Sequence, residues 1–155
     1  MVEQHTTKNS ELMFTKGVAY DVLNEKEKAE YYYRQALYNY PASVYYALRL
    51  TRYYIDQNNL RGAKEVIDSI NRYREKYTLF KNPNGVYFYV ITDFEAELAY
   101  KEGNLKKALS IAQQNLHNAE ADLFITSSIK AREFITRENV IQYLKARMEF
   151  YEKSQ

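Results

Sequence analysis

Apolar side chains recur every three or four residues along most of the chain, which is the spacing of one face of an α-helix. The series is clearest near the two ends, at Leu12, Met13, Val18 and Leu23 and again at Val140, Ile141, Leu144 and Met148. Strict alternation of apolar and polar residues, which marks a half-buried strand, is not sustained anywhere in the sequence. The pattern therefore predicts an all-α protein.

One stretch resembles a strand in composition, the run Val86-Tyr-Phe-Tyr-Val-Ile91. Aromatic and β-branched residues favour strands when they are taken singly. The run continues without a break into residues 92–100, where Phe94 and Leu98 keep helical spacing. We therefore predict a helix here as well.

Asn, Gly and Pro residues divide this helical sequence into short segments. Asn or Gly interrupts it at residues 23–26, 57–60 and 102–105, and Lys81-Asn-Pro-Asn-Gly85 is the strongest turn signal. Ser43 follows closely after a Pro, where its side chain can cap the next helix. We expect helices near residues 10–23, 26–39, 44–57, 60–78, 85–101, 105–119, 121–135 and 138–152.

The helix pairs repeat along the chain. A shift of 34 residues places the first pair on the second, so that Tyr20, Asn24, Ala29, Tyr33 and Ala36 fall on Tyr54, Asn58, Ala63, Ile67 and Ile70. A further shift of 45 places Ala99, Gly103, Ala108 and Ala112 on the same sites. The longer second interval is explained if the second helix of the second pair continues through residues 72–77. The sequence therefore predicts three copies of one helix pair.

These residues resemble the tetratricopeptide repeat family, whose period is about 34 residues. The first copy has Gly17-x2-Tyr20, Ala29-x3-Tyr33, Ala36 and Pro41 in the order and spacing of the family motif. The later copies depart from it, with Thr51 at the glycine position, and Met13 and Ala47 stand where the family has Trp. The alternative is another kind of helical bundle or solenoid.

The resemblance implies a right-handed superhelical array of antiparallel helix pairs, an α-solenoid. Its three pairs would span residues 10–43, 44–77 and 86–120, after a flexible segment at residues 1–9. Residues 121–155 do not continue the repeat, and we expect them to form C-terminal capping helices, because a repeat array needs a cover at its end. The alternative is that they link the array to a further module of a longer protein.

The composition excludes several kinds of site. The 155 residues contain no Cys, so disulfides and thiolate metal sites are excluded, and His5 and His117 belong to no common motif. The Gly residues are isolated, so no phosphate-binding loop is present. We expect no catalytic residues, no metal and no cofactor, and therefore not an enzyme.

The charge is nearly balanced, with 22 basic and 20 acidic residues and a net charge of +2. This balance gives no reason to expect nucleic acid or a membrane as a partner. The basic segment at residues 72–77 mixes charge with aromatic rings, but acidic neighbours favour a solvated helix face. The N-terminal residues lack the pattern of a secretory signal, so we expect a cytoplasmic protein.

The family resemblance implies that a peptide or helix of a partner protein lies in a concave groove lined by the first helix of each pair. This groove is predicted to contain Phe14, Tyr45, Arg49, Arg52, Asp56, Asp93, Glu97 and Tyr100. We therefore expect a protein-interaction scaffold. The alternatives are a sensory or regulatory domain of a larger regulator, in which a signalling peptide enters the same groove, and a protein that self-associates through its repeat ends.

Two arginines of the groove lie one turn apart. Arg49 and Arg52 could together bind a carboxylate or a phosphate of a ligand. The alternative is that they pair with the predicted acidic residues of the groove, and the sequence leaves both open. Family members that bind the C-terminal carboxylate of chaperones use a Lys and an Asn in the first repeat. Phe14 and Val18 stand at those places, so the resemblance does not extend to that specificity.

Tyr is unusually frequent, with seventeen residues, and five of them lie between residues 29 and 41. In the repeat, Tyr33 occupies a packing position between the helices. Tyr31, Tyr38 and Tyr40 are expected towards the convex side or the turn. We therefore predict that this stretch serves mainly as core, with a few rings left for contact.

Overall fold

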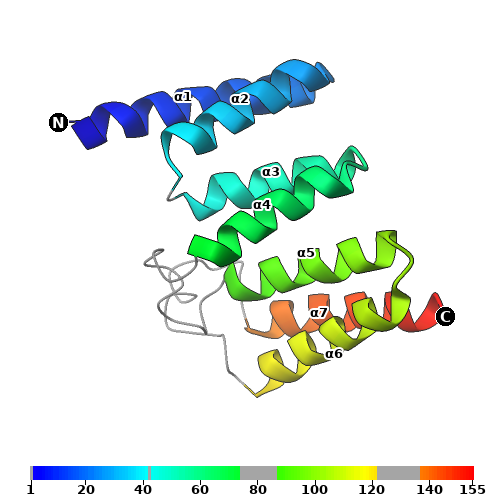
Figure 1. Ribbon diagram of the computed structural model, residues 1–155. Coiled ribbons are helices and arrows are strands. Elements are labelled where there is room, and N and C mark those ends of the chain that lie inside the picture. Colours follow the sequence, from blue (N-terminus) through cyan, green and yellow to red (C-terminus); the bar gives the residue numbers. More distant parts are fainter. Residues whose placement is uncertain (1, 42, 74–86, 122–136) are drawn as a thin grey trace. The chain divides into compact units, whose positions relative to one another are not determined.

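The described part of the chain folds into seven α-helices (Figure 1). The structure, a computed structural model, describes residues 2–41, 43–73, 87–121 and 137–155. The chain divides into two compact units, unit 1 (Met1–Tyr73) and unit 2 (Arg74–Gln155), and we describe each by itself. The helices are α1 (Val2–Val22), α2 (Lys26–Asn39), α3 (Val44–Asp56), α4 (Leu60–Tyr73), α5 (Tyr87–Lys101), α6 (Leu105–Glu120) and α7 (Arg137–Lys153).

Most helix boundaries agree with those predicted from the sequence. The main difference is α1, which begins at Val2, whereas we expected a flexible segment up to residue 9. Residues 2–16 contain neither Gly nor Pro, so no residue stops the helix there. The stretch from Tyr87 onwards is helical, as predicted. The expected helix at 121–135 and the residues after 73 in the fourth helix lie outside the described residues.

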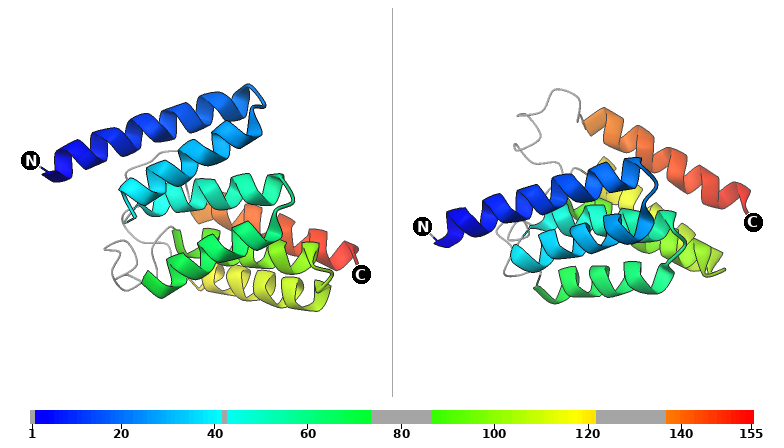
Figure 2. Two further views of the ribbon diagram at one scale, coloured as in Figure 1. Left: turned by 45° about the horizontal axis from the view of Figure 1, so that its top comes forward. Right: turned by 90° about the horizontal axis from the view of Figure 1, so that it is seen from above.

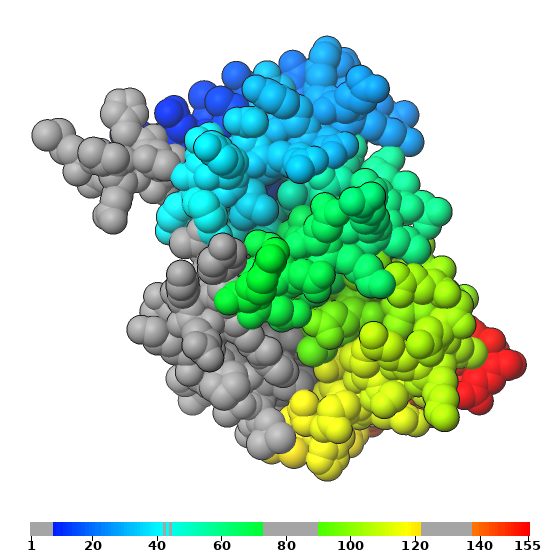
Figure 3. All heavy atoms as spheres, in the orientation of Figure 1, coloured from blue at the N-terminus to red at the C-terminus, as the bar shows by residue number. Residues whose placement is uncertain are grey.

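Each of the first six helices packs against its neighbour in sequence, in the antiparallel pairs α1–α2, α3–α4 and α5–α6 (Figures 1 and 2). Unit 1 contains the first two pairs, and unit 2 contains the third pair together with α7. Seen in space-filling form, the side chains of α2 and α4 cover one side of unit 1 (Figure 3).

The same turn closes the first helix of all three pairs. Asn24, Asn58 and Gly103 each have a positive φ, of 59°, 57° and 84° respectively. In each turn the amide of the next residue donates to the carbonyl five residues earlier, at 2.9, 2.8 and 2.8 Å. This is a Schellman motif, in which a left-handed residue satisfies the last carbonyls of a helix. The three sites that the internal repeat superimposes therefore share one backbone geometry.

Polar side chains cap the N-termini of three helices, α3, α4 and α6. Asn59 Oδ1 accepts a hydrogen bond from the amide of Gly62 at 2.9 Å, and Asn104 Oδ1 accepts one from Lys107 at 3.1 Å. Ser43 Oγ accepts from the amide of Tyr46 at 3.2 Å, so the predicted cap of α3 is confirmed. Such caps satisfy backbone donors that have no partner inside the helix.

Alanines occupy one repeated buried position in the second helix of each pair. Ala29, Ala63 and Ala108 occupy the same repeat position and are all fully buried. A larger side chain at these sites would push the helices apart. The small residues that the repeat places there therefore set the spacing within each pair.

A second pair of repeat positions is matched in size. Gly17 lies against the ring of Tyr33, and a Cβ on this glycine would be only 2.6 Å from Tyr33 Cδ1. The equivalent buried positions of the other pairs are Thr51 with Ile67 and Ala96 with Ala112. Across the three pairs, the smallest residue at the first position, Gly17, therefore occurs together with the largest residue at the second position, Tyr33.

The tyrosine-rich stretch at residues 29–41 is less buried than predicted: we expected it to serve mainly as core, but only one of its five tyrosines is buried. Tyr33 is 1% exposed. Tyr31, Tyr38 and Tyr40 are exposed, and Tyr38 is the most open of them at 80%. The helical period explains the division, because residues two positions apart point to different sides of a helix.

α7 lies on the α5–α6 pair as α3 lies on the α1–α2 pair. In both cases the added helix runs antiparallel to the second helix of the pair and also contacts the first (Figure 1). In α3 these contacts involve Tyr45 with Phe14, Arg49 with Asp21, and Tyr53 with Tyr33. In α7 they involve Tyr143 and Arg147 with Asp93, and Tyr151 joins a buried cluster with alanines of α5 and α6.

The other face of α7 differs from that of α3. When the two helices are aligned on these contacts, Ala47, Thr51 and Tyr54 of α3 correspond to Lys145, Glu149 and Glu152 of α7. The α3 residues are at most 4% exposed, whereas the α7 residues are all exposed. The face of α7 that corresponds to the buried face of α3 is therefore charged and open to solvent.

Candidate interaction surfaces

Four aromatic rings from α1, α3 and the end of α2 gather on unit 1. The ring of Phe14 lies 4.8 Å from that of Tyr46 and 5.3 Å from that of Tyr45, and Tyr40 lies 6.5 Å from Tyr46. Tyr45 is 57% exposed and Tyr40 is 40% exposed, whereas the other two rings are half-buried. We call these four residues the aromatic cluster. Its two exposed rings, Tyr45 and Tyr40, lie against the half-buried rings of Phe14 and Tyr46.

A cation lies one helical turn from the aromatic cluster. Arg49 Nη2 is 3.6 Å from Asp21 Oδ2, and the same oxygen accepts a hydrogen bond from the Tyr33 hydroxyl at 3.0 Å. The side chain of Arg49 remains 41% exposed, so it is held in place by Asp21 without being removed from solvent. Burial raises the pKa of Tyr33, and therefore its hydroxyl stays a donor at neutral pH.

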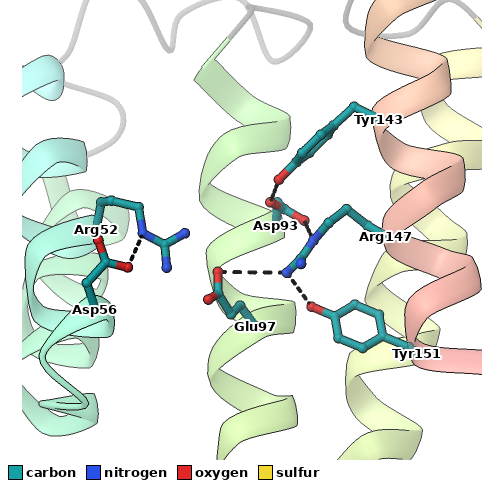
Figure 4. A network of polar contacts seen from close by, with 7 residues as sticks. All are labelled: Arg52, Asp56, Asp93, Glu97, Tyr143, Arg147 and Tyr151. Carbon is teal, nitrogen blue, oxygen red and sulfur yellow. Dashed lines mark hydrogen bonds and ion pairs between the residues drawn. The ribbon is translucent and has the colours of Figure 1, made fainter. Parts of the chain in front are cut away.

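The next arginine is held within its own helix. Arg52 Nε donates to Asp56 Oδ1 at 3.0 Å, one turn further along α3 (Figure 4). Both side chains are at least one-third exposed, so this ion pair adds little to stability. Of the predicted groove residues, unit 1 thus brings Phe14, Tyr45 and Arg49 together, while Arg52 and Asp56 form a neighbouring pair.

The predicted groove residues of α5 all contact α7 of the same chain. Asp93 Oδ2 accepts from the Tyr143 hydroxyl at 2.5 Å, and Asp93 Oδ1 accepts from Arg147 Nε at 3.2 Å (Figure 4). Glu97 lies 3.7 Å from Arg147 Nη2. Tyr100 packs against Phe150 and Tyr151 of α7, with ring centres 5.2 and 5.5 Å away.

The charged groups of this polar network are largely shielded from solvent, whereas Tyr143 is 46% exposed. The Asp93 side chain is only 9% exposed and that of Arg147 is 23% exposed. Arg147 Nη2 also donates to the Tyr151 hydroxyl at 2.7 Å, and its guanidinium lies over that ring. Burial, followed by the charge of Asp93, raises the pKa of Tyr143, and burial raises the pKa of Tyr151 to about 12. Both hydroxyls therefore stay protonated at neutral pH; that of Tyr143 donates to Asp93 and that of Tyr151 accepts from Arg147.

The residues of α7 that form this network were not predicted. The sequence contained a signal for them, because Tyr143, Arg147 and Tyr151 repeat the four-residue spacing of Tyr45, Arg49 and Tyr53. The signal is hard to detect because the alanine positions used to find the repeat are absent from α7. Comparing only the face that packs on the preceding pair would have shown it.

The described residues contain no cluster of three or more His, Asp or Glu side chains suited to hold a metal ion. In the same part of the chain, no helix combines the length and apolar character that crossing a membrane requires.

Comparison with protein-family models, curated proteins and solved structures finds no match to this chain. The resemblance to tetratricopeptide repeats therefore depends on the repeated residues of the sequence and on the shared geometry of their turns.

Proposed function

We propose that the chain is a protein-interaction module of tetratricopeptide type, which binds a peptide or helix of a partner protein on the surface of unit 1 formed by its first helices α1 and α3. The observation that carries this proposal is the aromatic cluster with Arg49 beside it. Tyr, Phe and Arg are the residues that commonly dominate the binding energy of protein interfaces.

The geometry of the aromatic cluster favours binding over simple exposure. Its rings contact one another and the buried Tyr33, which lies 5.8 Å from Phe14, so little side-chain freedom would be lost on binding. Tyr45 offers a large apolar surface with a hydroxyl at its tip, which suits contact with a polypeptide. Arg49 adds a positive charge, which would favour a ligand with a carboxylate nearby.

Selection from a displayed library of random peptides tests this proposal. Selected peptides are labelled and titrated with the full-length chain by fluorescence anisotropy. Tyr45→Ala should weaken binding at least about tenfold, the loss typical of an interface anchor. Tyr38→Ala is the matched control, because Tyr38 is even more exposed and lies on α2.

The charge is tested in the same way. Arg49→Gln should weaken binding of peptides that contain acidic residues, whereas Arg61→Gln should not, since Arg61 is an exposed cation of α4 that pairs with Glu65. Circular dichroism establishes that each variant keeps its helices. If no peptide is selected, or if Tyr45→Ala and Tyr38→Ala bind alike, the proposal is wrong.

Self-association is a second candidate, favoured by exposed apolar residues of α1 and of the turn that follows it. Leu12 and Val22 of α1 are 51% and 81% exposed, and Leu23 of the turn is 66% exposed. The neighbours Val22 and Leu23 form an apolar surface that a second copy of the chain could cover. Light scattering over a range of concentrations distinguishes the two candidates. A constant mass would exclude self-association, while Leu12→Glu should reduce any concentration-dependent increase.

A further inference from the structure

The surface of the α5–α6 pair that receives α7 has the composition of a binding interface. α7 contributes two tyrosines and an arginine to it, Tyr143, Tyr151 and Arg147, which are residue types enriched in the centres of protein interfaces. Beside this polar network, Leu144 and Val140 of α7 pack on α6 in an apolar cluster. A single helix is thus held by an apolar stripe and by the ion pairs of Arg147 with Asp93 and Glu97.

The same mode of docking occurs in the other unit. α3 docks on the α1–α2 pair with tyrosines four residues before and after an arginine, and its Arg49 pairs with a carboxylate of α1, Asp21. α7 repeats this spacing, and Arg147 pairs with a carboxylate of α5, Asp93. Two helices with otherwise different sequences therefore dock on two pairs through the pattern Tyr-x3-Arg-x3-Tyr.

A shielded carboxylate makes such a surface selective. A helix without the arginine would leave the shielded carboxylate of Asp93 without a counter-charge, which strongly weakens docking. A helix without the first tyrosine would lack the hydrogen bond that Tyr143 donates to Asp93. The surface therefore discriminates against most amphipathic helices by the penalty that it imposes on them.

We propose that the Asp93 face of the α5–α6 pair is a docking site for an amphipathic helix with the pattern Tyr-x3-Arg-x3-Tyr. α7 is the occupant that the chain supplies, and a partner helix of the same pattern binds in exchange for it. This site lies in unit 2 and is independent of the aromatic cluster of unit 1.

A labelled synthetic peptide of residues 137–155 is the probe. It is titrated with a full-length chain that carries Leu144→Asp and Tyr151→Asp, because charges at these buried positions release its own α7. We expect saturable binding, and its loss when Asp93→Ala is added to this chain. A peptide with Arg147→Ala should bind at least about tenfold more weakly. A peptide with Lys145→Ala should bind unchanged, since Lys145 is exposed.

A second measurement uses the unaltered chain, in case the doubly substituted chain does not fold. Hydrogen exchange of α7 amides is followed with excess unlabelled peptide. Exchange should become faster with the peptide of natural sequence and stay slow with the Arg147→Ala peptide. The proposal is overturned if the folded variant fails to bind, if the two altered peptides bind alike, or if excess peptide leaves α7 exchange unchanged.

Discussion

Gly17 and Tyr33 are in direct contact, so that any larger residue at position 17 would overlap the tyrosine ring. A Cβ there would lie 2.6 Å from Cδ1 and 2.9 Å from Cε1 of the ring. The ring is itself fixed, because it is buried and its hydroxyl donates to Asp21. The two residues occupy positions that the repeat fills with Thr51 and Ile67 in the second pair.

This contact predicts that Gly17→Ala destabilises the protein. Overpacking usually costs about 1–3 kcal/mol, while Ala gains roughly 1 kcal/mol over Gly inside a helix. We expect a net loss of about 1 kcal/mol, measured by urea denaturation with circular dichroism. In a Tyr33→Ile background, which copies the second pair, the same substitution should become neutral or stabilising. An equal loss in both backgrounds would contradict the contact.

The turn after α5 predicts a different effect of an added methyl group. Gly103 has φ 84°, and no heavy atom lies within 4 Å of the position of an added Cβ. Gly103→Ala should therefore lower the free energy of unfolding by about 1 kcal/mol through backbone strain alone. Gly103→Asn should cost much less, because Asn24 and Asn58 adopt this conformation in the other turns. Thermal unfolding of the two variants compares them, and equal losses would exclude this explanation.

Buried tyrosines predict that the protein loses stability in alkali. Burial, followed by the hydrogen bond to Glu30, raises the pKa of Tyr54 to about 12, whereas an unfolded tyrosine has a pKa of about 10. Below pH 10 this contribution is complete, because both states keep the proton. Between about pH 10 and 12 the unfolded state releases its proton while the folded state retains it, so the free energy of unfolding falls.

Urea denaturation at a series of pH values measures this loss. Tyr54→Phe should make the decrease above pH 10 shallower, since a phenylalanine cannot ionise. At neutral pH the variant should lose about 1 kcal/mol, the usual contribution of one hydrogen bond. Tyr38→Phe serves as the control, because Tyr38 is 80% exposed. Identical pH profiles for Tyr54→Phe and the unaltered protein would contradict the prediction.

The charged outer face of α7 predicts how self-association could be created. Lys145→Ala, Glu149→Thr and Glu152→Tyr together give α7 the residues that α3 has at its buried face. This variant should form larger species as its concentration rises, since it exposes a face of the kind that α3 keeps buried. Light scattering measures the mass. A variant with Gln at all three positions removes the charges without adding apolar surface, and its mass should stay constant.

The positions of the helices and turns could be predicted from local sequence. Asn24, Asn58 and Gly103 end their helices because these residue types tolerate a positive φ, and Ser43 begins α3 because its hydroxyl accepts a backbone amide. The start of α1 was misplaced, because a polar segment without Gly or Pro carries no clear signal for or against a helix.

The candidate site could be predicted only in part. Phe14, Tyr45 and Arg49 lie together in unit 1, because the repeat period places them on neighbouring first helices. Asp93 and Glu97 were chosen by the same reasoning, but local sequence could not reveal that Arg147, some fifty residues later, would lie against them. The helical period and the turn residues depend on neighbours a few positions away in the sequence. The pairing of Arg147 with Asp93 and Glu97 depends instead on how α7 packs on the α5–α6 pair.

The sequence by itself determined three helix pairs, the turns between their helices and the small residues at which those helices meet. Each of these follows from side-chain size or backbone freedom at a single position. Only the tertiary structure decided which first-helix residues remain uncovered. Tyr45 is open to solvent while Asp93 is shielded, because the docking of a helix from elsewhere in the chain removes one surface from water and leaves the other exposed.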